Sequence, residues 1–488
     1  MGVDDADRAE VRRLLGREPR GQFAVVVRGA DGQPVVIRNS PLLDDGTPMP
    51  TRYWLVGERE REAVSRLESS GGVDQAERAV DPDELSDAHR RYAEERSAVL
   101  PQGWSGPRPE GGVGGTRRGV KCLHAHLAWY LAGGEDPVGR YVAARLAGPA
   151  VAAVDCGTNS TRLLVAAPWP FGCGLVDPPV PVSSCGGLGL GTPLIALRRE
   201  MRITRLGEGV DATGVLAGAA IARCVEVLDS YQRMSASMQV TALRAVATSA
   251  VRDAGNRDEF LDAAGAVLGV RPEVLDGQAE GALSFAGATV DLAPEQAPAL
   301  VVDIGGGSTE LVTGPTGSGA AGGGGGGTIS PKLTAAVSLP IGCVRLTERH
   351  LHHDPPRVEE IDAARAEVVS LLEATAAANP SLLGATTFVG LAGTVSALAM
   401  IDLGLDRYET ALVHGHEMTR SRVESLLEEL ASQPVEQRRL RLGLEPARAE
   451  VIVGGAIVLV EALRCLKHES LVVSERDILD GVAMSLGH

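Results

Sequence analysis

The segment LVVDIGGGSTEL, residues 300–311, indicates the fold most clearly, and the remaining motifs are interpreted from it. Its apolar start, Leu300–Val302, predicts a buried strand that ends at Asp303. After this strand come Gly305, Gly306, Gly307, Ser308, Thr309 and Glu310. Glycine backbone can approach an anion closely, and the flanking carboxylates are hard oxygen ligands for Mg²⁺ or Mn²⁺. The segment therefore predicts a phosphate and metal site; a glycine-rich β-turn without a ligand is the alternative.

A second turn of the same kind lies upstream, in AAVDCGTNSTRLLVA, residues 152–166. Its apolar residues, Val151–Val154, predict a strand that ends at Asp155. After this strand come Gly157, Thr158, Asn159, Ser160 and Arg162. Two strand-Asp-x-Gly turns about one domain apart are far more specific than either turn alone. They predict two turns that face each other across a cleft.

With these motifs the chain resembles the exopolyphosphatase and guanosine pentaphosphate phosphohydrolase (Ppx/GppA phosphatase) family, a branch of the superfamily of actin, sugar kinases and the Hsp70 ATPase. The matching segments are VDCGTNSTR (154–162), LGEGVDATGVL (206–216), ATSAVRDAGN (247–256), LDGQAEGALSFAGA (275–288), VDIGGGSTELV (302–312), SLPIGCVRLTE (338–348), GLAGTVSALA (390–399) and VHGHEMT (413–419). The resemblance covers residues 150–488. It implies an α/β, actin-like fold, which is a duplicated ribonuclease H-like fold with a cleft between lobes at 148–290 and 291–488.

Residues 1–147 are predicted to form a separate small α+β domain. The alternating segments FAVVVRG and QPVVIRN predict paired strands, and helices are expected at Arg59–Ser69, at Pro82–Val99 and in VKCLHAHLAWYLAGG. Residues 103–119 are predicted to be a mobile loop. This half resembles the bacterial domain of unknown function 501 family, and the resemblance is carried by LGREPRG, DGTPMPTRYWL, RLESSGGV and VKCLHAHLA. That family implies a domain boundary and no activity.

Three residues of this domain are of types that bind metals: Cys122, His124 and His126. On a helix, positions 124 and 126 do not share a face, which argues against a metal site with two histidines. Core packing or a polar helix contact is therefore the preferred interpretation of these side chains.

Composition restricts the partners and the location of the protein. The formal charge of −16 leaves no broad basic surface for nucleic acid, so an anionic substrate needs a local site of metal, glycine backbone and a few arginines. Seven scattered cysteines without a CxxC pair are typical of a reducing cytosol. The longest apolar run, Val451–Val460, is too short to cross a membrane. A cytoplasmic protein without membrane or nucleic-acid partners is expected, with a homodimer suggested by the resemblance.

The site residues follow from what hydrolysis of a phosphoanhydride requires: neutralised phosphoryl charge, a positioned water and a base. The predicted metal ligands are Asp155, Asp303 and Glu310. The predicted phosphate-binding residues are Gly157, Asn159, Ser160, Arg162, Gly305, Gly306, Gly307, Ser308, Gly393 and Thr394. Arg252 is a further candidate for charge compensation, because a guanidinium matches phosphate geometry.

The resemblance also implies the catalytic base. The catalytic glutamate of the family is the second acid of a Gly-x-Glu-Glu-Ala motif, and this chain reads Gly277-Gln278-Ala279-Glu280-Gly281. The first acid is lost and the second is kept, so Glu280 is the implied general base, with a pKa expected near the working pH. The alternative is an exposed glutamate stabilised by a helix N-terminus.

The resulting prediction is an exopolyphosphatase that releases terminal phosphate from inorganic polyphosphate with Mg²⁺ or Mn²⁺, with guanosine pentaphosphate as a second substrate. Because the chain ends without the C-terminal helical domains of longer family members, short polyphosphate is the expected chain length. The alternatives are a non-catalytic polyphosphate or alarmone sensor and a sugar or acetate kinase. Residues 168–193 are interpreted as a surface excursion, residues 314–328 as a glycine-rich linker and residues 211–231 as one helix.

Overall fold

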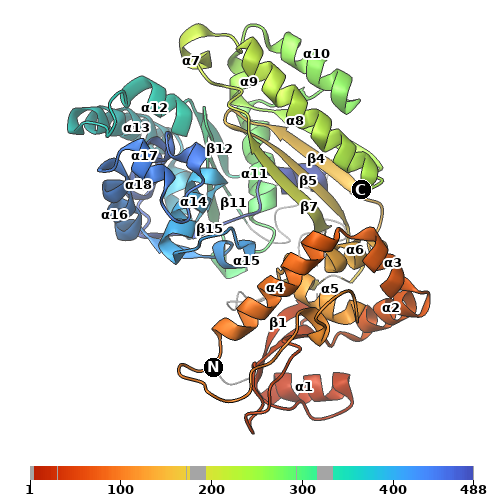
Figure 1. Cartoon of the computed structure of the whole chain (residues 1–488). Helices are drawn as coiled ribbons and strands as arrows, with labels where there is room; N and C mark the ends of the chain where they lie inside the picture. The colour runs from red at the N-terminus through yellow and green to blue at the C-terminus, as the bar shows by residue number, and fades with distance from the viewer. Residues whose placement is uncertain are drawn as a thin grey trace. The chain divides into compact units, whose positions relative to one another are not determined.

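The structure is a computed structural model that describes residues 5–29, 31–171, 173–175, 194–292, 294–315 and 333–486. Most of the predicted excursion and the predicted glycine-rich linker lie outside these ranges. The chain divides into two compact units, each described separately below (Figure 1). Unit 1 comprises Met1–Gly148, Ala167–Gly187 and Thr192–Leu197, and unit 2 comprises Pro149–Ala166, Leu188–Gly191 and Arg198–His488.

Unit 1 is built on a four-stranded sheet with the order β3-β2-β1-β6. The predicted strand pair is present, since β1 and β2 are antiparallel with Phe23 opposite Asn39. The strands are β1 (Phe23–Gly29), β2 (Pro34–Asn39), β3 (Tyr53–Leu55) and β6 (Cys173–Leu175). The helices are α1 (Asp5–Leu15), α2 (Glu58–Ser69), α3 (Gly72–Ala79), α4 (Pro82–Ala98), α5 (Leu123–Leu131) and α6 (Pro137–Leu146), with a 3₁₀ turn at Val113–Gly115. Helices α3 and α6 were not predicted.

Two segments predicted as loose connections are held in place. In the described part of the insertion, β6 pairs with β1, and Trp169 is buried with its ring 5.0 Å from that of Phe171. The surface-excursion prediction is therefore wrong for these residues, because an aromatic anchor and an unpaired strand edge both favour docking. The loop at 103–119 is likewise fixed, since Arg96 donates to the carbonyls of Pro109 and Gly111 at 3.0 and 2.7 Å.

Unit 2 contains two sheets with the same topology. The first has the order β7-β5-β4-β8-β9 and the second β12-β11-β10-β13-β15-β14. In each, an antiparallel hairpin (β4 with β5, β10 with β11) is extended by parallel strands on one side. On the other side β7 neighbours β5 and β12 pairs antiparallel with β11, and β14 adds an antiparallel edge to the second sheet. The first sheet comprises β4 (Val151–Cys156), β5 (Ser160–Pro168), β7 (Leu194–Ile203), β8 (Ala242–Ala247) and β9 (Glu273–Val274). The second comprises β10 (Ala299–Ile304), β11 (Thr309–Gly314), β12 (Ala335–Leu339), β13 (Thr387–Leu391), β14 (Glu417–Thr419) and β15 (Ser470–Val473).

The helices of unit 2 cover both sheets and also connect them. The helix predicted at 211–231 is divided, because the chain is left-handed at Gly214 (φ 70°), which ends the first short helix before α8 starts. Helices α11 and α19 pack on each other; α11 also contacts the second sheet and α19 contacts β4 of the first. The helices are α7 (Val210–Thr213), α8 (Gly218–Ser237), α9 (Ser249–Asp253), α10 (Arg257–Leu268), α11 (Gly277–Ala288), α12 (Cys343–His350), α13 (Val358–Ala378), α14 (Ala392–Leu403), α15 (Thr410–Val413), α16 (Arg420–Ala431), α17 (Val435–Arg439), α18 (Ile452–Cys465) and α19 (Ile478–Met484).

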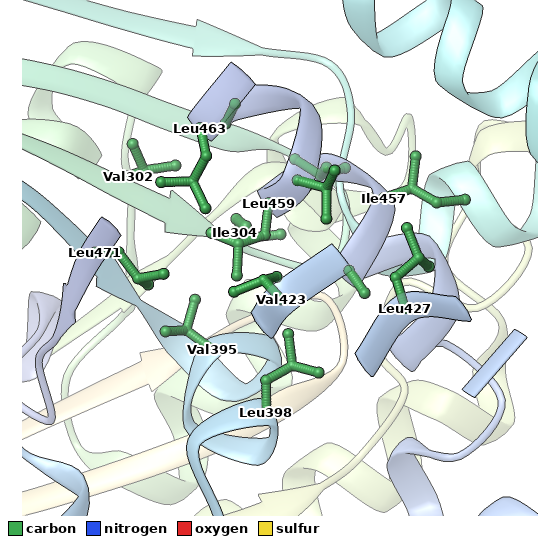
Figure 2. Packing of buried hydrophobic residues seen from close by; sticks show 14 of the residues in the cluster. Val302, Ile304, Val395, Leu398, Val423, Leu427, Ile457, Leu459, Leu463 and Leu471 are labelled. Carbon is green, nitrogen blue, oxygen red and sulfur yellow. The ribbon is translucent and has the colours of Figure 1, made fainter. Parts of the chain in front are cut away.

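The apolar run noted in the sequence forms α18, the central helix of the larger core. All side chains from Ile452 to Leu463 are buried, as expected for a helix that is apolar on every face. Figure 2 shows Leu459 and Leu463 of this helix facing Ile304 and Val302 of β10. Burial of each such aliphatic side chain contributes about 1.5–3 kcal/mol. The packing of α18 thereby holds β10, the strand that leads into the glycine turn, in position.

Candidate active site

The two hairpins that carry the Asp-x-Gly turns have the same construction. In the first, β4 and β5 are joined by a turn in which Gly157 N–H donates to the Ser160 carbonyl at 3.0 Å. In the second, β10 and β11 are joined by a turn in which Gly305 N–H donates to the Ser308 carbonyl at 3.0 Å. The duplication implied by the strand order therefore extends to the turns.

Helix α12 orients the peptide groups of the second turn. The Gly305 carbonyl accepts from Cys343 N–H at 2.9 Å, and the Gly306 carbonyl accepts from the amides of Val344 and Arg345 at 2.9 and 3.1 Å. In a trans peptide the N–H points opposite to the C=O. The N–H groups of Gly306 and Gly307 therefore point away from α12. Only the carbonyls of this turn are used by the N-terminus of α12.

The two turns touch each other. A Cβ at Gly306 would lie 2.8 Å from the Thr158 Cβ and 3.3 Å from the Asn159 amide nitrogen, so only glycine fits there. Thr158 is itself fixed, because its hydroxyl is 2.9 Å from that of Ser249 in α9. The crevice lined by Thr158 and Gly307 holds only about 10 Å³, room for a single water molecule. The two sheets are thus closed against each other at this point.

Two buried acids of the second hairpin lie side by side. Asp303 accepts a hydrogen bond from Ser284 of α11 at 2.8 Å, and Glu310 accepts one from Ser338 of β12 at 2.8 Å. Burial raises the pKa of Asp303 to about 6, against the favourable charge of Arg162. Burial also raises the pKa of Glu310 well above its usual range, and the charges of nearby acids add to the effect. A pair of this kind attracts a cation strongly.

Glu280 is in the first turn of α11 and is buried rather than exposed. Its Oε2 accepts from Arg252 Nη1 at 2.9 Å, and the same nitrogen donates to the Leu275 carbonyl at 2.8 Å. Burial raises the pKa of Glu280 to about 7; Arg252 opposes this shift, while Asp303 and Asp155 add to it. The alternative of an exposed glutamate at a helix end is therefore excluded. Arg252 is placed to orient this carboxylate.

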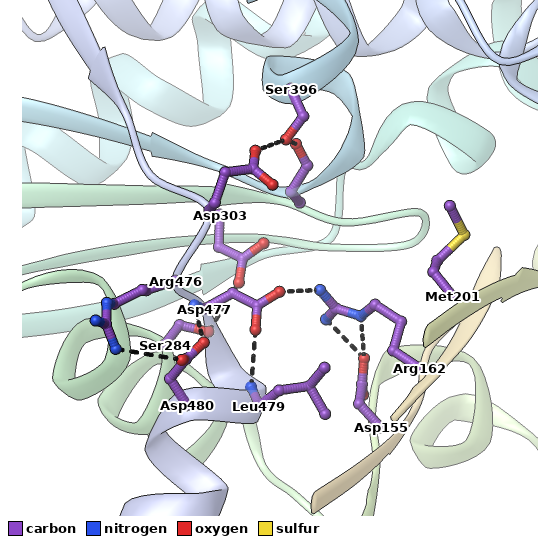
Figure 3. A network of polar contacts seen from close by, with 12 residues as sticks. Asp155, Arg162, Met201, Ser284, Asp303, Ser396, Arg476, Asp477, Leu479 and Asp480 are labelled. Atoms are coloured by element: carbon purple, nitrogen blue, oxygen red, sulfur yellow. Dashed lines mark hydrogen bonds and ion pairs between the residues drawn. The ribbon is translucent and has the colours of Figure 1, made fainter. Parts of the chain in front are cut away.

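Arg162 is paired with acids on both sides (Figure 3). Its Nε and Nη2 donate to Asp155 Oδ2 at 2.9 and 2.7 Å, and its Nη1 bonds Asp477, the N-cap residue of α19. Arg199 lies 3.5 Å from the other oxygen of Asp477. The structure thus places Arg162, predicted to bind phosphate, beside Asp155, with its charge already neutralised by two carboxylates.

The predicted anion site at the start of α14 is covered by a side chain. The guanidinium of Arg448 packs directly against Gly393, and the Thr394 side chain packs against Gly455 of α18. Thr394 also hydrogen-bonds the thiol of Cys343, the residue whose amide holds the glycine turn. Gly393 is therefore covered by Arg448, and Thr394 contacts Cys343 of α12. Neither residue forms part of an open helix N-terminus.

Several residues of the site were not identified from the sequence. The capping pattern of Asp477 and Asp480 ahead of the apolar start of α19 was a readable helix-start signal. Ser284, Ser338 and Arg448 carry no such signal, because their roles depend on contacts between elements remote in the chain.

Two unpartnered polar atoms belong to the first of the two hairpins. Asp155 Oδ1 and Asn159 Nδ2 are buried, and neither has a hydrogen-bond partner. Buried polar atoms are almost always paired, so a free acceptor and a free donor indicate a cation and an anion respectively. The carboxylates of Asp155, Asp303 and Glu310 are hard oxygen donors that suit a divalent ion with attached phosphate. Among the described residues their oxygens do not all lie within 4.8 Å of one another, so binding one ion with all three needs side-chain movement.

Comparison with known proteins agrees with this geometry. Residues 188–488 match the model of the Ppx/GppA phosphatase family, and residues 25–144 match that of a protein of unknown function, DUF501. The chain belongs to the Ppx/GppA phosphatase family. Exopolyphosphatase 2 of Mycobacterium tuberculosis is 41% identical over 345 residues, which cover 69% of this chain and 98% of that protein. Both predicted family resemblances are confirmed.

Solved structures of this family share the fold. The crystal structure of an exopolyphosphatase-like protein is 34% identical with a TM-score of 0.59, covering 70% of this chain and 98% of that one. The Ppx/GppA enzyme of Aquifex aeolicus is 29% identical with a TM-score of 0.53, covering 69% and 99%. The predicted actin-like α/β fold is confirmed, and family membership makes the chain a phosphatase-type hydrolase. Among the helices that the structure describes, none is long and apolar enough to cross a membrane.

Proposed function

We propose that this protein is an exopolyphosphatase that releases terminal phosphate from inorganic polyphosphate, using Mg²⁺ or Mn²⁺. One observation carries the proposal: buried acids gather at two glycine turns where Asp155 Oδ1 and Asn159 Nδ2 lack partners. Such a site suits a metal-bound polyanion, and a relative at 41% identity is named an exopolyphosphatase.

Glu280 is the proposed general base. Its pKa of about 7 lets it exist as a carboxylate at neutral pH and still accept a proton from the attacking water. Arg252 holds the Oε2 atom and leaves the second carboxylate oxygen for that water. The water oxygen bonds to the terminal phosphorus, the bridging P–O bond breaks, and the shortened chain departs with the electrons of that bond.

The other proposed roles concern charge. Asp155, Asp303 and Glu310 would hold the metal, which when bound supplies neutralising charge for the phosphoryl oxygens. The turn amides of Gly305–Ser308 and Gly157–Ser160 would receive those oxygens, as glycine-rich turns do in other phosphate sites. Arg162 would bind a phosphoryl oxygen once Asp155 binds the metal instead, because one side of its guanidinium is then free.

Substrate entry requires the two hairpins to separate. Gly306 and Thr158 are in contact where the two hairpins meet, and the crevice of about 10 Å³ beside that contact is too small for a phosphate group. We therefore expect the two sheets of unit 2 to move apart to admit substrate and to close on it again, which would exclude bulk water during the reaction.

Three finer points are also proposals. Guanosine pentaphosphate ends in the same phosphoanhydride and would be a second substrate. Short polyphosphate and a homodimer are the expectations for chain length and assembly, and a ladder of chain lengths and a light-scattering mass would test them.

The decisive experiment measures phosphate release from polyphosphate with Mg²⁺ and without ATP or sugar. Glu280→Gln is expected to lower kcat by about 10²–10⁴-fold while polyphosphate binding persists. Glu226→Gln, an exposed glutamate of α8, is the matched control and should retain activity. Tight binding without turnover by the unmodified protein would favour a sensor, and phosphate transfer that needs a sugar or acetate acceptor would favour a kinase.

A further inference from the structure

Unit 1 contains a cluster of metal-binding side chains that the phosphatase site does not involve. Within the described residues, Glu68, Cys122 and His124 each offer a ligand atom, and these atoms lie within 4.8 Å of one another. Glu68 is near the end of α2, Cys122 is the N-cap residue of α5 and His124 is in the first turn of α5. Cys122 and His124 were candidates in the sequence together with His126, whereas Glu68 comes from another helix and was not identified.

The hydrogen bonds of His124 leave one ring nitrogen directed at the cluster. Its Nε2 lies 3.2 Å from both the carbonyl oxygen of Arg61 and the hydroxyl of Ser65. A hydrogen on Nε2 satisfies the carbonyl, which only accepts, and the hydroxyl can accept as well. In the neutral ring Nδ1 then holds a lone pair, and it faces Glu68 Oε1 at 3.2 Å and Cys122 Sγ at 3.9 Å. A lone pair opposite a carboxylate oxygen is repulsive, and either a proton on Nδ1 or a bound metal cation between the two atoms removes the repulsion.

The distances match a tetrahedral zinc ion. With bonds of about 2.0–2.3 Å at tetrahedral angles, nitrogen and oxygen ligands lie ~3.3 Å apart, and sulfur and nitrogen ligands ~3.6 Å apart. The observed separations are 3.2 Å from His124 Nδ1 to Glu68 Oε1 and 3.9 Å from His124 Nδ1 to Cys122 Sγ. These two separations differ from the tetrahedral values by about 0.1–0.3 Å, so the side chains need to move by only a few tenths of an ångström to bind the ion. Side-chain exposures of 25% for His124 and 27% for Glu68 leave room for a water as fourth ligand.

The ligands are also held by outer contacts of the type found in metal sites. The His124 ring is oriented by the Arg61 carbonyl, and Glu68 Oε1 accepts from Leu123 N–H at 2.7 Å, which fixes the carboxylate at the start of α5. Such outer partners set ring orientation and ligand basicity in zinc proteins. Cys122 needs no rearrangement of the chain, because its extended backbone already directs Sγ to the same side as the imidazole.

We propose that Glu68, Cys122 and His124 bind one Zn²⁺ ion per chain in unit 1. A thiolate, an imidazole and a carboxylate are donors that suit zinc and that discriminate against Mg²⁺, the ion proposed for unit 2. The ion joins the end of α2 to the start of α5, two helices that pack together although Glu68 and Leu123 are 55 positions apart. It therefore stabilises unit 1 independently of the phosphatase site.

The test uses the full chain, stripped with chelator and kept in excess Mg²⁺ to occupy hard-oxygen sites. Equilibrium dialysis with Zn²⁺ is expected to load one equivalent more onto the unmodified protein than onto Cys122→Ser or His124→Ala. Affinity should fall by at least the ~10–100-fold that loss of an outer partner costs in known sites. Cys465→Ser, another partly exposed free thiol, is the matched control and should load zinc normally.

Cobalt provides a readout specific for the thiolate. Co²⁺ bound at this site should give a sulfur-to-metal charge-transfer absorption that Cys122→Ser abolishes and Cys465→Ser retains. If Cys122→Ser fails to fold, Glu68→Gln preserves the acceptor for Leu123 N–H and removes only the charge, and it should still lose zinc affinity. Equal zinc loading by all variants, or the absence of the charge-transfer absorption in the unmodified protein, would overturn the proposal.

Discussion

Arg162 occupies in the first hairpin of unit 2 the position that Glu310 occupies in the second. Arg162 pairs across the strands with Asp155, and Glu310 pairs across the strands with Asp303. Since the two turns have the same hydrogen-bonded construction, the difference between the hairpins is one of charge. The first hairpin pairs its acid with a guanidinium that suits a phosphate, whereas the second pairs its acid with another acid that suits a metal.

This asymmetry predicts which hairpin controls the metal requirement. Glu310→Gln should raise the Mg²⁺ concentration for half-maximal activity by about 10–100-fold, because a neutral amide replaces one of two buried acids facing the ion. The Ser338 hydroxyl still has an acceptor in the variant, so the fold should persist. A magnesium titration of phosphate release, compared with that of Glu226→Gln, measures the shift. An unchanged requirement would remove Glu310 from the proposed ligand set.

The pH dependence of activity should follow the contact between Arg252 and Glu280. Activity needs the carboxylate form, so kcat/KM should fall as the pH drops below about 7. Arg252 lowers the pKa of Glu280, so Arg252→Gln should raise that pKa and move the acidic limb of the profile to higher pH. Arg252→Lys keeps a positive charge and should move it less. A profile that falls in height without shifting would show that Arg252 acts on something other than this ionisation.

The stability of the metal-free protein should depend on pH in the direction set by its buried acids. The pKa values of Glu280 and Asp303 are raised in the folded protein to about 7 and about 6. Their stabilising effect is complete below the unfolded pKa of about 4 and is lost as the pH rises through the folded values. With chelator, the melting temperature should therefore fall between about pH 5 and pH 8.

Added Mg²⁺ should reverse that loss at the upper end of the range, because a bound cation stabilises the ionised acids. Thermal melts with and without Mg²⁺ at both pH values provide the measurement. The effect of Mg²⁺ should be larger at the higher pH, and Glu280→Gln should flatten the dependence on pH. A magnesium effect of equal size at both pH values would contradict the proposed cluster.

Charge at the first hairpin is set by Asp477, and its removal should tighten substrate binding. Asp477→Asn keeps a side-chain oxygen that can cap α19 but removes one of the two carboxylates that neutralise Arg162. Removing this carboxylate is expected to gain about 1 kcal/mol for the polyanion, which corresponds to roughly a fivefold lower KM for polyphosphate. Steady-state kinetics at two salt concentrations test this, since the gain should shrink at high salt. A raised KM would instead mean that Asp477 holds Arg162 in its working position.

Local patterns predicted more of this protein than remote contacts did. The glycine turns, the acids beside them and the strands that lead into them follow from apolar runs and turn residues, which are local signals, whereas the actin-like fold was implied by the family resemblance. Other contacts depend on elements that are remote in the sequence. They are made by Asp477 of α19, Ser284 of α11 and Arg448 of the segment before α18, and the residues next to them in the sequence do not predict these contacts. Docking of the segment around Trp169 was missed for the same reason: Arg59, which donates to the carbonyl of the adjacent Pro170, lies 111 positions earlier in the chain.

The closed contact between the turns offers the most direct test of how the site works. In Gly306→Ala the new methyl group would lie 2.8 Å from the Thr158 Cβ, so the two hairpins could no longer close fully. Because closure would exclude water and align the turn amides with the substrate, kcat should fall by about 10²-fold while binding in the open form weakens far less. Gly218→Ala, at the open start of α8, meets no atom within 4 Å and should leave kcat unchanged. If Gly306→Ala retained full activity, catalysis would not require the two turns to meet, and the site would have to act in its open form.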